Sequence, residues 1–349
     1  MNIAFDSHKR YTLCSVADDC GKVLEEVRIE HTRGAIVDYL CRFPKGESVA
    51  VETIGNWYWI VDEIEGAGLR PLLVHARKAK AMMCSYNKTD RLDVRGLNRL
   101  QQAGVLPTVW IPPGELRDQR DLPRTRMYLV AMRTRLKNRI HSALAKYALK
   151  VPDVRDMFGK LCRGRLLHEI GRLPVHSRLT TEEQLGYVDS LDRSIASLDD
   201  RISQTFDDTE EVQLIRTIPG IGPVLGIVVR LEVGDINRFG SSGRLASYAG
   251  TVPRIHASGG RVRHGQLRPD VNRYLKWAYS EAANSIVVNQ QIYPDRHVTK
   301  LYRRIRYKRG HQKAIGAVAR HLAEATYWIL TKKEPYLDPA LKQSMPTGV

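Results

Sequence analysis

The chain has 349 residues, which is enough for two or three domains, each with its own hydrophobic core. Its 55 lysines and arginines outnumber 38 aspartates and glutamates, and the formal net charge of +17 at pH 7 favours a polyanionic partner, with nucleic acid as the first candidate. A membrane partner is disfavoured because no apolar run approaches the ~20 residues of a spanning helix, and because the N-terminus enters a strand pattern without a signal peptide. We therefore expect a cytoplasmic protein that associates with the nucleoid when it is bound to DNA.

The cysteines point to the same compartment. They are odd in number, scattered along the chain, and spaced unlike the ligands of a metal site. We therefore expect reduced thiols rather than disulfides. The residues concerned are Cys14, Cys20, Cys41, Cys84 and Cys162.

Residues 1–110 have the pattern of a mixed α/β domain that begins with a hairpin. Gly21 marks the turn between the second and third strands. Short apolar runs predict strands over residues 3–5, 12–16, 23–29, 49–51 and 72–74. Apolar residues at helical spacing predict helices over residues 36–41 and 57–64.

Four carboxylates are the most informative residues of this domain. Asp6 follows the first strand and Glu52 follows the fourth, so both are expected at strand ends of one sheet. Asp90 and Asp93 are three residues apart, which places both on one side of a helix. A single acidic residue in so charged a chain is usually a solvated surface residue, but this order is the layout of an RNase H-like nuclease core. Because converging carboxylates repel each other, we predict that they bind Mg2+ or Mn2+.

The pattern changes to long helices after the proline-rich segment at residues 111–114. Apolar residues recur at helical spacing in two stretches, which predicts an antiparallel helical hairpin or an oligomeric coiled coil within residues 111–207. These residues are Leu129, Met132, Leu136, Ile140, Ala143 and Tyr147 in the first stretch, and Val188, Leu191, Ile195, Leu198 and Ile202 in the second. The first helix is also basic, and its polar face is either an ordinary solvated surface or, as the net charge favours, a nucleic-acid-binding arm. The basic residues are Arg124, Arg126, Arg133, Arg135, Lys137 and Arg139.

The last region, residues 208–349, contains a glycine-rich turn and several basic segments. Gly220 and Gly222 would let a turn bring backbone N–H groups close to a phosphate, as in helix-hairpin-helix elements, although a plain tight turn is the alternative. Basic residues interleaved with tyrosines suit contact with a nucleic-acid backbone together with stacking. The candidate contact residues are Arg254, Arg261, Arg303, Arg304, Arg306 and Lys308.

Taken together, these motifs resemble the DEDD insertion-sequence transposases of the IS110 type, a family that includes the Piv DNA invertases and the recombinases guided by a bridge RNA. The resemblance extends over nearly the whole chain, and the joint order of the motifs is more specific than any one of them. Besides Asp6 and Glu52, the motifs lie at residues 88–93, 218–222, 248–254, 258–259 and 308–320.

The resemblance implies an α/β RNase H/RuvC-like N-terminal domain over residues 1–110, a helical coiled-coil region over residues 111–207, and a mostly α-helical C-terminal transposase domain over residues 208–349. It implies a metal-binding quartet and a serine nucleophile that forms a phosphoserine link to DNA. The implied catalytic residues are Asp6, Glu52, Asp90 and Asp93 for the metal, and Ser258 for the nucleophile.

The resemblance also implies the partners. They are donor DNA, target DNA, a structured non-coding guide RNA, and further copies of the chain in a dimer or tetramer with composite active sites.

The chain departs from the family at residues 267–271, where a Thr/Ser-Lys-x-Gly turn is usual, and at residues 52–55, where Glu-x-Thr-Gly is usual. Neither departure removes a predicted catalytic residue.

Two other functions remain open on the sequence. A metal-dependent, RuvC-like junction resolvase would use water as the nucleophile and would need only the first domain. An architectural or RNA-packaging protein would use the basic helices but gives no reason for acids at two strand ends. The recombinase accounts for the most motifs, so we take it as the leading hypothesis.

Overall fold

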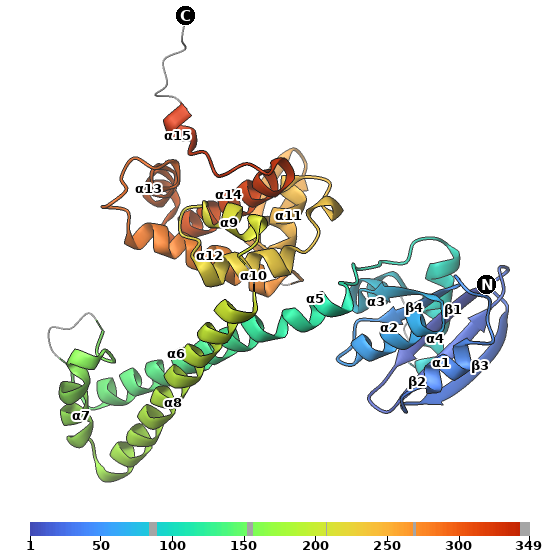
Figure 1. The fold of residues 1–349 in the computed structure, drawn as a ribbon, viewed down its shortest axis with the longest axis horizontal. Helices are drawn as coiled ribbons and strands as arrows, with labels where there is room; N and C mark the ends of the chain where they lie inside the picture. Colours follow the sequence, from blue (N-terminus) through green and yellow to red (C-terminus); the bar gives the residue numbers. More distant parts are fainter. Residues whose placement is uncertain (84–88, 152–155, 207, 268–269, 343–349) are drawn as a thin grey trace, which may run out of the picture. The chain divides into compact units, whose positions relative to one another are not determined.

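The computed structural model of the chain describes residues 1–83, 89–151, 156–206, 208–267 and 270–342. Internal contacts group the chain into two units, Met1–Glu115 and Leu116–Val349 (Figure 1). None of the helices in the described residues is both long enough and apolar enough to cross a membrane. Among the described cysteines, the free thiols are Cys14, Cys20, Cys41 and Cys162, while Cys84 lies outside the described residues.

The first unit is a five-stranded mixed sheet with helices on both faces. The strands are β1 Asn2–Ser7, β2 Tyr11–Ala17, β3 Val23–Glu30, β4 Ser48–Glu52 and β5 Arg70–Val74. The helices are α1 Ala35–Leu40, α2 Trp57–Gly66, α3 Ala76–Met83 and α4 Asp90–Gln102. The strand order is β3-β2-β1-β4-β5, with β1, β2 and β3 antiparallel and with β4 and β5 parallel to β1. All five predicted strands and both predicted helices are confirmed, with ends that differ by one or two residues, whereas α3 was not predicted.

Alternate residues of the central strands face opposite helical layers, as the two-residue period of a strand requires. Ile3 and Phe5 pack in one core with residues of α1 and α2. Ala4 and Ala50 pack in a second core, on the other face, with residues of α3 and α4. The face that carries α4 is therefore the face toward which Asp6, two residues after Ala4, is directed.

In its described residues, the second unit consists of helices and one β-hairpin. Its first helices are α5 Gly114–Gln119, α6 Asp121–Lys146, η1 Lys160–Cys162, α7 Arg163–Gly171 and α8 Val175–Thr205. They are followed by α9 Glu210–Arg216, α10 Pro223–Val233, η2 Ile236–Arg238 and α11 Ser242–Tyr248. The hairpin consists of β6 Pro253–Ser258 and β7 Arg261–Leu267, and the last helices are α12 Arg273–Val288, α13 His297–Arg309, α14 His311–Lys332 and α15 Pro339–Lys342.

The two long helices, α6 and α8, pack against each other as an antiparallel pair. Arg126 near the start of α6 pairs with Asp199 near the end of α8, at 2.6 Å between Nε and Oδ1. Just beyond the other end of α6, the Tyr147 hydroxyl lies 3.0 Å from Ser177 Oγ, near the start of α8. The structure thus shows the hairpin alternative within a single chain. The predicted separate region of residues 111–207 stays a prediction, since most of it belongs to the second unit by its contacts.

The helices after α8 build a hydrophobic core of their own in the second unit. Leu275, Tyr279 and Leu322 are buried in it and come from α12 and α14. Gly220 lies so close to α12 that a Cβ atom there would come within 2.3 Å of the Ala282 carbonyl oxygen. Its backbone φ of 83° is also one that glycine adopts without strain. The glycine-rich turn therefore has a packing role in this core.

Candidate active site and nucleic-acid contacts

Asp6 and Glu52 lie on neighbouring strands at the same edge of the sheet. β1 and β4 are parallel, and Phe5 is the register partner of Val51. Asp6 and Glu52 are the next residues of the two strands, and both follow by two positions an alanine that faces α4. Both acids lie at strand ends of one sheet, as the sequence predicted, and the register directs the two carboxylates to the same face.

Asp90 and Asp93 occupy the first turn of α4, which packs on this face. Thr89 caps the helix, its hydroxyl accepting a hydrogen bond from the Leu92 N–H at 3.3 Å. Val94 is buried against the sheet four residues after Asp90. The helix dipole favours carboxylates at this end of α4. Lys88, the first residue of the same motif, lies outside the described residues.

The structure brings Asp6 and Asp90 together and adds His8 to them. His8 Nε2 lies 3.4 Å from Asp6 Oδ2 and 3.1 Å from Asp90 Oδ2. The ligand atoms of these three side chains all lie within 4.8 Å of one another, and within the described residues no other group of histidine, cysteine or carboxylate side chains is so arranged for a metal ion. Glu52 and Asp93 are neighbours of this group but not members of it.

Tyr11 contacts this group through Asp90. Its hydroxyl donates a hydrogen bond of 2.9 Å to Asp90 Oδ2. This hydrogen bond to a carboxylate is the main reason that the pKa of Tyr11 is raised above its ordinary value. Asp90 is thereby held in place by the Tyr11 hydroxyl.

His8 is a residue that the sequence analysis missed. It is two positions after Asp6, so a strand that continued to His8 would place both side chains on one face, although β1 ends at Ser7. That spacing was visible in the sequence. What the sequence could not show was that the turn after β1 brings His8 toward a helix that begins at Asp90.

Ser258 ends β6, next to the tight turn of the hairpin. It pairs with Arg261 across the turn, and the residues between them, Gly259 and Gly260, have φ of 54° and 73°. Two positive φ values are what a two-residue hairpin turn requires, and glycine adopts them without strain. The Ser258 side chain is exposed. The two glycines therefore place a hydroxyl at the tip of an accessible hairpin.

Basic residues share the face of the hairpin that carries Ser258. His256 is two residues before Ser258 and pairs with Arg263, while Ser258 pairs with Arg261. Directly paired residues of antiparallel strands, and residues two apart on one strand, lie on the same face. Ser258 thus shares its face with two exposed arginines and a histidine. Arg263 was not among the predicted contacts, although its spacing from Arg261 would have identified it.

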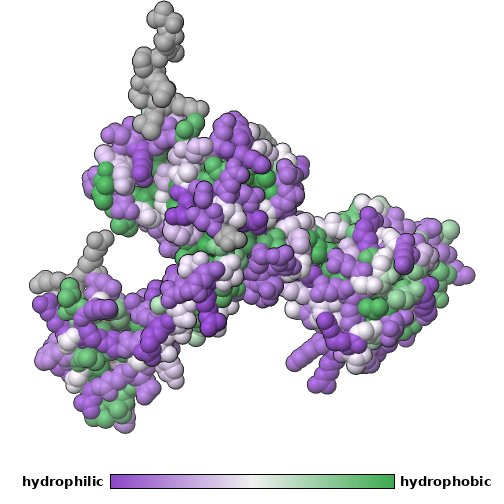
Figure 2. Space-filling view, in the orientation of Figure 1, coloured by the Kyte–Doolittle hydropathy of each residue, from purple (hydrophilic) through white to green (hydrophobic). Residues whose placement is uncertain are grey.

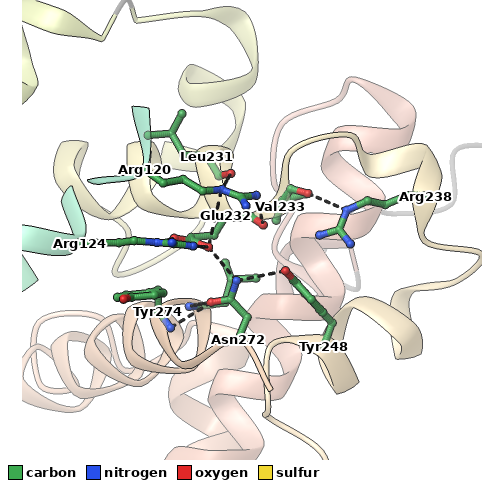
Figure 3. Close-up of polar contacts among 10 residues, drawn as sticks. Arg120, Arg124, Leu231, Glu232, Val233, Arg238, Tyr248, Asn272 and Tyr274 are labelled. Atoms are coloured by element: carbon green, nitrogen blue, oxygen red, sulfur yellow. Dashed lines mark hydrogen bonds and ion pairs between the residues drawn. The ribbon is translucent and has the colours of Figure 1, made fainter. Parts of the chain in front are cut away.

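The base of this hairpin is held by a buried polar network (Figure 3). Asn272 caps α12 through its side-chain oxygen, and its Nδ2 donates to Glu232 Oε2 at 2.7 Å and to the Tyr248 hydroxyl at 3.3 Å. The Asn272 backbone N–H also donates to the Tyr248 carbonyl at 2.9 Å. Since Tyr248 precedes the hairpin and Asn272 follows it, these bonds join its two ends. Arg268 and Pro269, part of the departure from the family turn, lie outside the described residues.

Three of the basic residues predicted on α6 have carboxylate partners inside the chain. Arg124 binds Glu232, Arg126 binds Asp199 through two hydrogen bonds, and Arg133 lies 2.6 Å from Asp192. These arginines hold α6 against its neighbours. The other three are Arg135 and Arg139, which are exposed, and Lys137, whose Nζ lies 4.8 Å from the centre of the Phe158 ring.

The remaining predicted contacts lie in the C-terminal helices and the hairpin. Gly220 and Gly222 belong to a turn that borders a surface pocket together with Tyr293 and Arg296. The basic residues of α13 and β6 are exposed, and the surface in view is largely hydrophilic (Figure 2). They are Arg254, Arg303, Arg304, Arg306 and Lys308, with the Arg303 guanidinium donating to the Gln290 carbonyl. Tyr302, beside them, is 1% exposed and belongs to the core, so it is not available for stacking.

Two family models match separate parts of the chain. Residues 3–149 match a model of DEDD transposases of the IS110 group. Residues 212–297 match a model described as the transposase IS116/IS110/IS902 family. A DEDD transposase domain implies an RNase H-like fold, with which the mixed five-stranded sheet agrees.

Curated proteins similar to the chain include two named as transposases and one named as a gene-inverting protein. The transposase for insertion sequence element IS1111A of Coxiella burnetii is 26% identical over 93% of this chain and 88% of its own length. A probable family 20 transposase of Pseudomonas aeruginosa is 24% identical over 68% of this chain and 71% of its own. The pilin gene-inverting protein of Moraxella bovis is 30% identical over 41% of this chain and 45% of its own.

Proposed function

Because the chain belongs to the IS110-type transposases and is thus a DNA-acting enzyme, we propose that it is a serine recombinase that moves its own insertion sequence under the guidance of a structured RNA. The observation that carries this proposal is the placement of Ser258. It is exposed at a hairpin tip, on one face with Arg261 and Arg263. A hydroxyl beside two guanidinium groups suits attack on a phosphodiester, whose negative charge the arginines bind.

The reaction proposed for this site conserves the phosphodiester bond. Ser258 Oγ attacks the scissile phosphorus, a bond forms between Oγ and phosphorus, and the bond to the 3′ oxygen breaks. The proton of the serine passes to the departing 3′ oxygen through the site. A 3′ hydroxyl of the second DNA then attacks the phosphoserine, which restores both the serine and a phosphodiester. Strand exchange is complete without net hydrolysis.

The acidic residues fit a divalent cation. Asp6 and Asp90 offer hard oxygen donors, and a buried nitrogen of His8 faces them without a well-formed hydrogen bond. We assign Glu52 and Asp93 to the same quartet from their positions on β4 and α4. When bound, Mg2+ or Mn2+ supplies Lewis acidity to phosphoryl transfer.

Because Ser258 and the acids belong to different units, we also propose that copies of the chain combine into a dimer or tetramer with composite sites.

The guide RNA is the partner that would provide sequence choice. Exposed basic residues on α6 and α13, such as Arg135, Arg139 and Arg304, suit contact with a nucleic-acid backbone. Such contacts carry no sequence information by themselves, so base pairing with an RNA would select donor and target. The pilin gene-inverting protein, by its name, inverts a gene, which supports DNA strand exchange as the type of reaction.

Recombination between a donor plasmid and a target plasmid tests this proposal. Purified protein is supplied with RNA transcribed from the non-coding DNA that flanks its open reading frame, and junctions are detected by sequencing. We expect junctions only with this RNA, and their position should move when the complementary bases of the RNA are changed. Junctions that form without RNA would contradict guidance. Cut but unjoined DNA would instead favour a metal-dependent resolvase that uses water.

A further inference from the structure

We propose that His8 is a direct ligand of the catalytic cation, so that Asp6, His8 and Asp90 form a mixed nitrogen and oxygen site that prefers Mn2+ to Mg2+. The inference rests on the proposed function in so far as this is the recombinase's metal site. It goes beyond an all-carboxylate quartet by adding a histidine and a choice of metal.

The distances are those of ligands that share one ion. His8 Nε2 is 3.1 Å from Asp90 Oδ2 and 3.4 Å from Asp6 Oδ2. Ligands at about 2.1 to 2.2 Å from an octahedral ion lie roughly 3.0 Å apart when they occupy adjacent positions. The nitrogen is thus already close to the spacing from each carboxylate oxygen that a common ion would impose, and the ligand atoms of the two carboxylates lie within 4.8 Å of each other.

The imidazole nitrogen lacks the hydrogen bond that its surroundings would lead one to expect. His8 Nε2 is buried, and despite its short distances to two carboxylates it forms no hydrogen bond of acceptable direction. Asp90 Oδ2 instead accepts the Tyr11 hydroxyl at 2.9 Å. The nitrogen therefore has two carboxylates within ion-pair distance but no hydrogen bond of good direction, while the His8 side chain as a whole is 35% exposed. Coordination of an ion by the nitrogen lone pair would satisfy this atom.

The position of His8 is fixed by other bonds. Its backbone N–H donates to the Tyr11 carbonyl at 2.8 Å, and its own carbonyl accepts from Asn56 Nδ2 at 3.0 Å. Its ring also packs on the Tyr11 ring, with 4.7 Å between centroids. The ligand nitrogen is therefore held toward the carboxylates by the turn after β1 and by a side chain that precedes α2.

The donor set decides the metal. Mg2+ prefers oxygen ligands and keeps several of its waters, whereas imidazole suits transition metals. Mn2+ accepts both oxygen and nitrogen donors and has the same charge as Mg2+. A site of two carboxylates and one imidazole should therefore favour Mn2+ more strongly than a site made of carboxylates alone.

Electron spin-echo spectroscopy of Mn2+ bound to the full-length protein, without nucleic acid, tests this directly. A coordinated imidazole nitrogen modulates the echo, and we expect this modulation in the wild-type protein. It should vanish in His8→Ala, and Mn2+ affinity measured by calorimetry should fall by at least about tenfold, with a smaller loss for Mg2+. His75→Ala, in the same unit but outside the group, should leave the modulation and both affinities unchanged.

The outcomes separate this inference from the proposed function. Bound Mn2+ without nitrogen modulation in the wild type, with affinity lost in Asp6→Asn, would overturn the role of His8 and leave the carboxylate site standing. No Mn2+ or Mg2+ binding at all would overturn both. The wild-type spectrum needs no variant, so a misfolded His8→Ala protein would not weaken the test.

Discussion

Arg124 and Glu232 form a two-bond ion pair in the second unit, with 2.6 Å between Nε and Oε1 and 2.9 Å between Nη2 and Oε2. Glu232 is 2% exposed, and it also accepts a hydrogen bond from Asn272, which caps α12 after the Ser258 hairpin. The pair thus connects α6, α10 and the base of the hairpin. Arg124, which the sequence predicts in a nucleic-acid-binding arm, thus also has a structural contact within the chain.

Arg124→Ala should destabilise the protein strongly. It removes the two-bond partner of the buried Glu232 carboxylate, which keeps Asn272 and also Arg120, whose Nε lies 3.8 Å from Oε2. The loss should therefore stay below about 3 to 5 kcal/mol, which is the cost of a buried charge left without any partner. Arg133→Ala is the matched control, because its pair with Asp192 is 29% and 45% exposed and is worth less than about 1 kcal/mol. Urea unfolding measures both. Equal losses in the free energy of unfolding for the two variants would show that the buried Glu232 pair stabilises the protein no more than the exposed Asp192 pair does.

The four carboxylates should be needed for strand exchange but not for nucleic-acid binding. Asn in place of Asp6, Asp90 or Asp93, or Gln in place of Glu52, removes a negative oxygen without adding bulk, so the fold should survive. Because mutual repulsion between Asp6 and Asp90 is relieved, Asp6→Asn should unfold at a temperature no lower than the wild type without metal. Addition of EDTA to the wild type should match the variants. Wild-type recombination by any of the four would remove that residue from the site.

Salt should weaken nucleic-acid binding through the exposed arginines of α13. Each phosphate contact that is lost lowers the slope of log affinity against log salt by about 0.9 on duplex DNA. We expect the double variant Arg304→Ala/Arg306→Ala to lower the slope, because both side chains are exposed. Arg126→Ala should not, since its guanidinium already binds Asp199. Fluorescence anisotropy over a salt series measures the slopes, and two unchanged slopes would exclude α13 from the interface.

Acid should destabilise the second unit through His321. Burial is the main reason that the pKa of His321 is lowered, and the neighbouring His297, with 4.9 Å between ring centroids, lowers it further. Below about pH 6.5 the unfolded chain binds a proton that the folded His321 does not, so stability falls as the pH falls. The melting temperature of His321→Gln should therefore decline less in this range than that of the wild type. Parallel declines would assign the acid sensitivity to other groups.

The sequence was sufficient for the parts of the fold that depend on local periodicity. The strands that end near Asp6 and Glu52 were predicted because alternation and apolar runs are local signals. His8 was missed because its relation to Asp90 crosses most of the first unit. The pairing of the two long helices within one chain also needed the structure, because it depends on pairs such as Arg126 and Asp199 that are distant in the chain. Distant contacts are decided by packing, and a single sequence carries little information on them.

Detection of a covalent protein–DNA intermediate separates attack by Ser258 from attack by water. Attack by Ser258 leaves a phosphodiester between protein and DNA that survives denaturation, whereas attack by water leaves none. The protein is incubated with its RNA and with DNA that is nicked near the exchange point, and the products are separated on a denaturing gel. Ser242→Ala is the control variant. The neighbouring Ser241 is unsuitable as a control because its side chain caps α11, so that its loss would affect folding. We predict a slow, protease-sensitive band in the wild type and in Ser242→Ala, and its absence in Ser258→Ala and in EDTA; strand exchange by Ser258→Ala would contradict the mechanism.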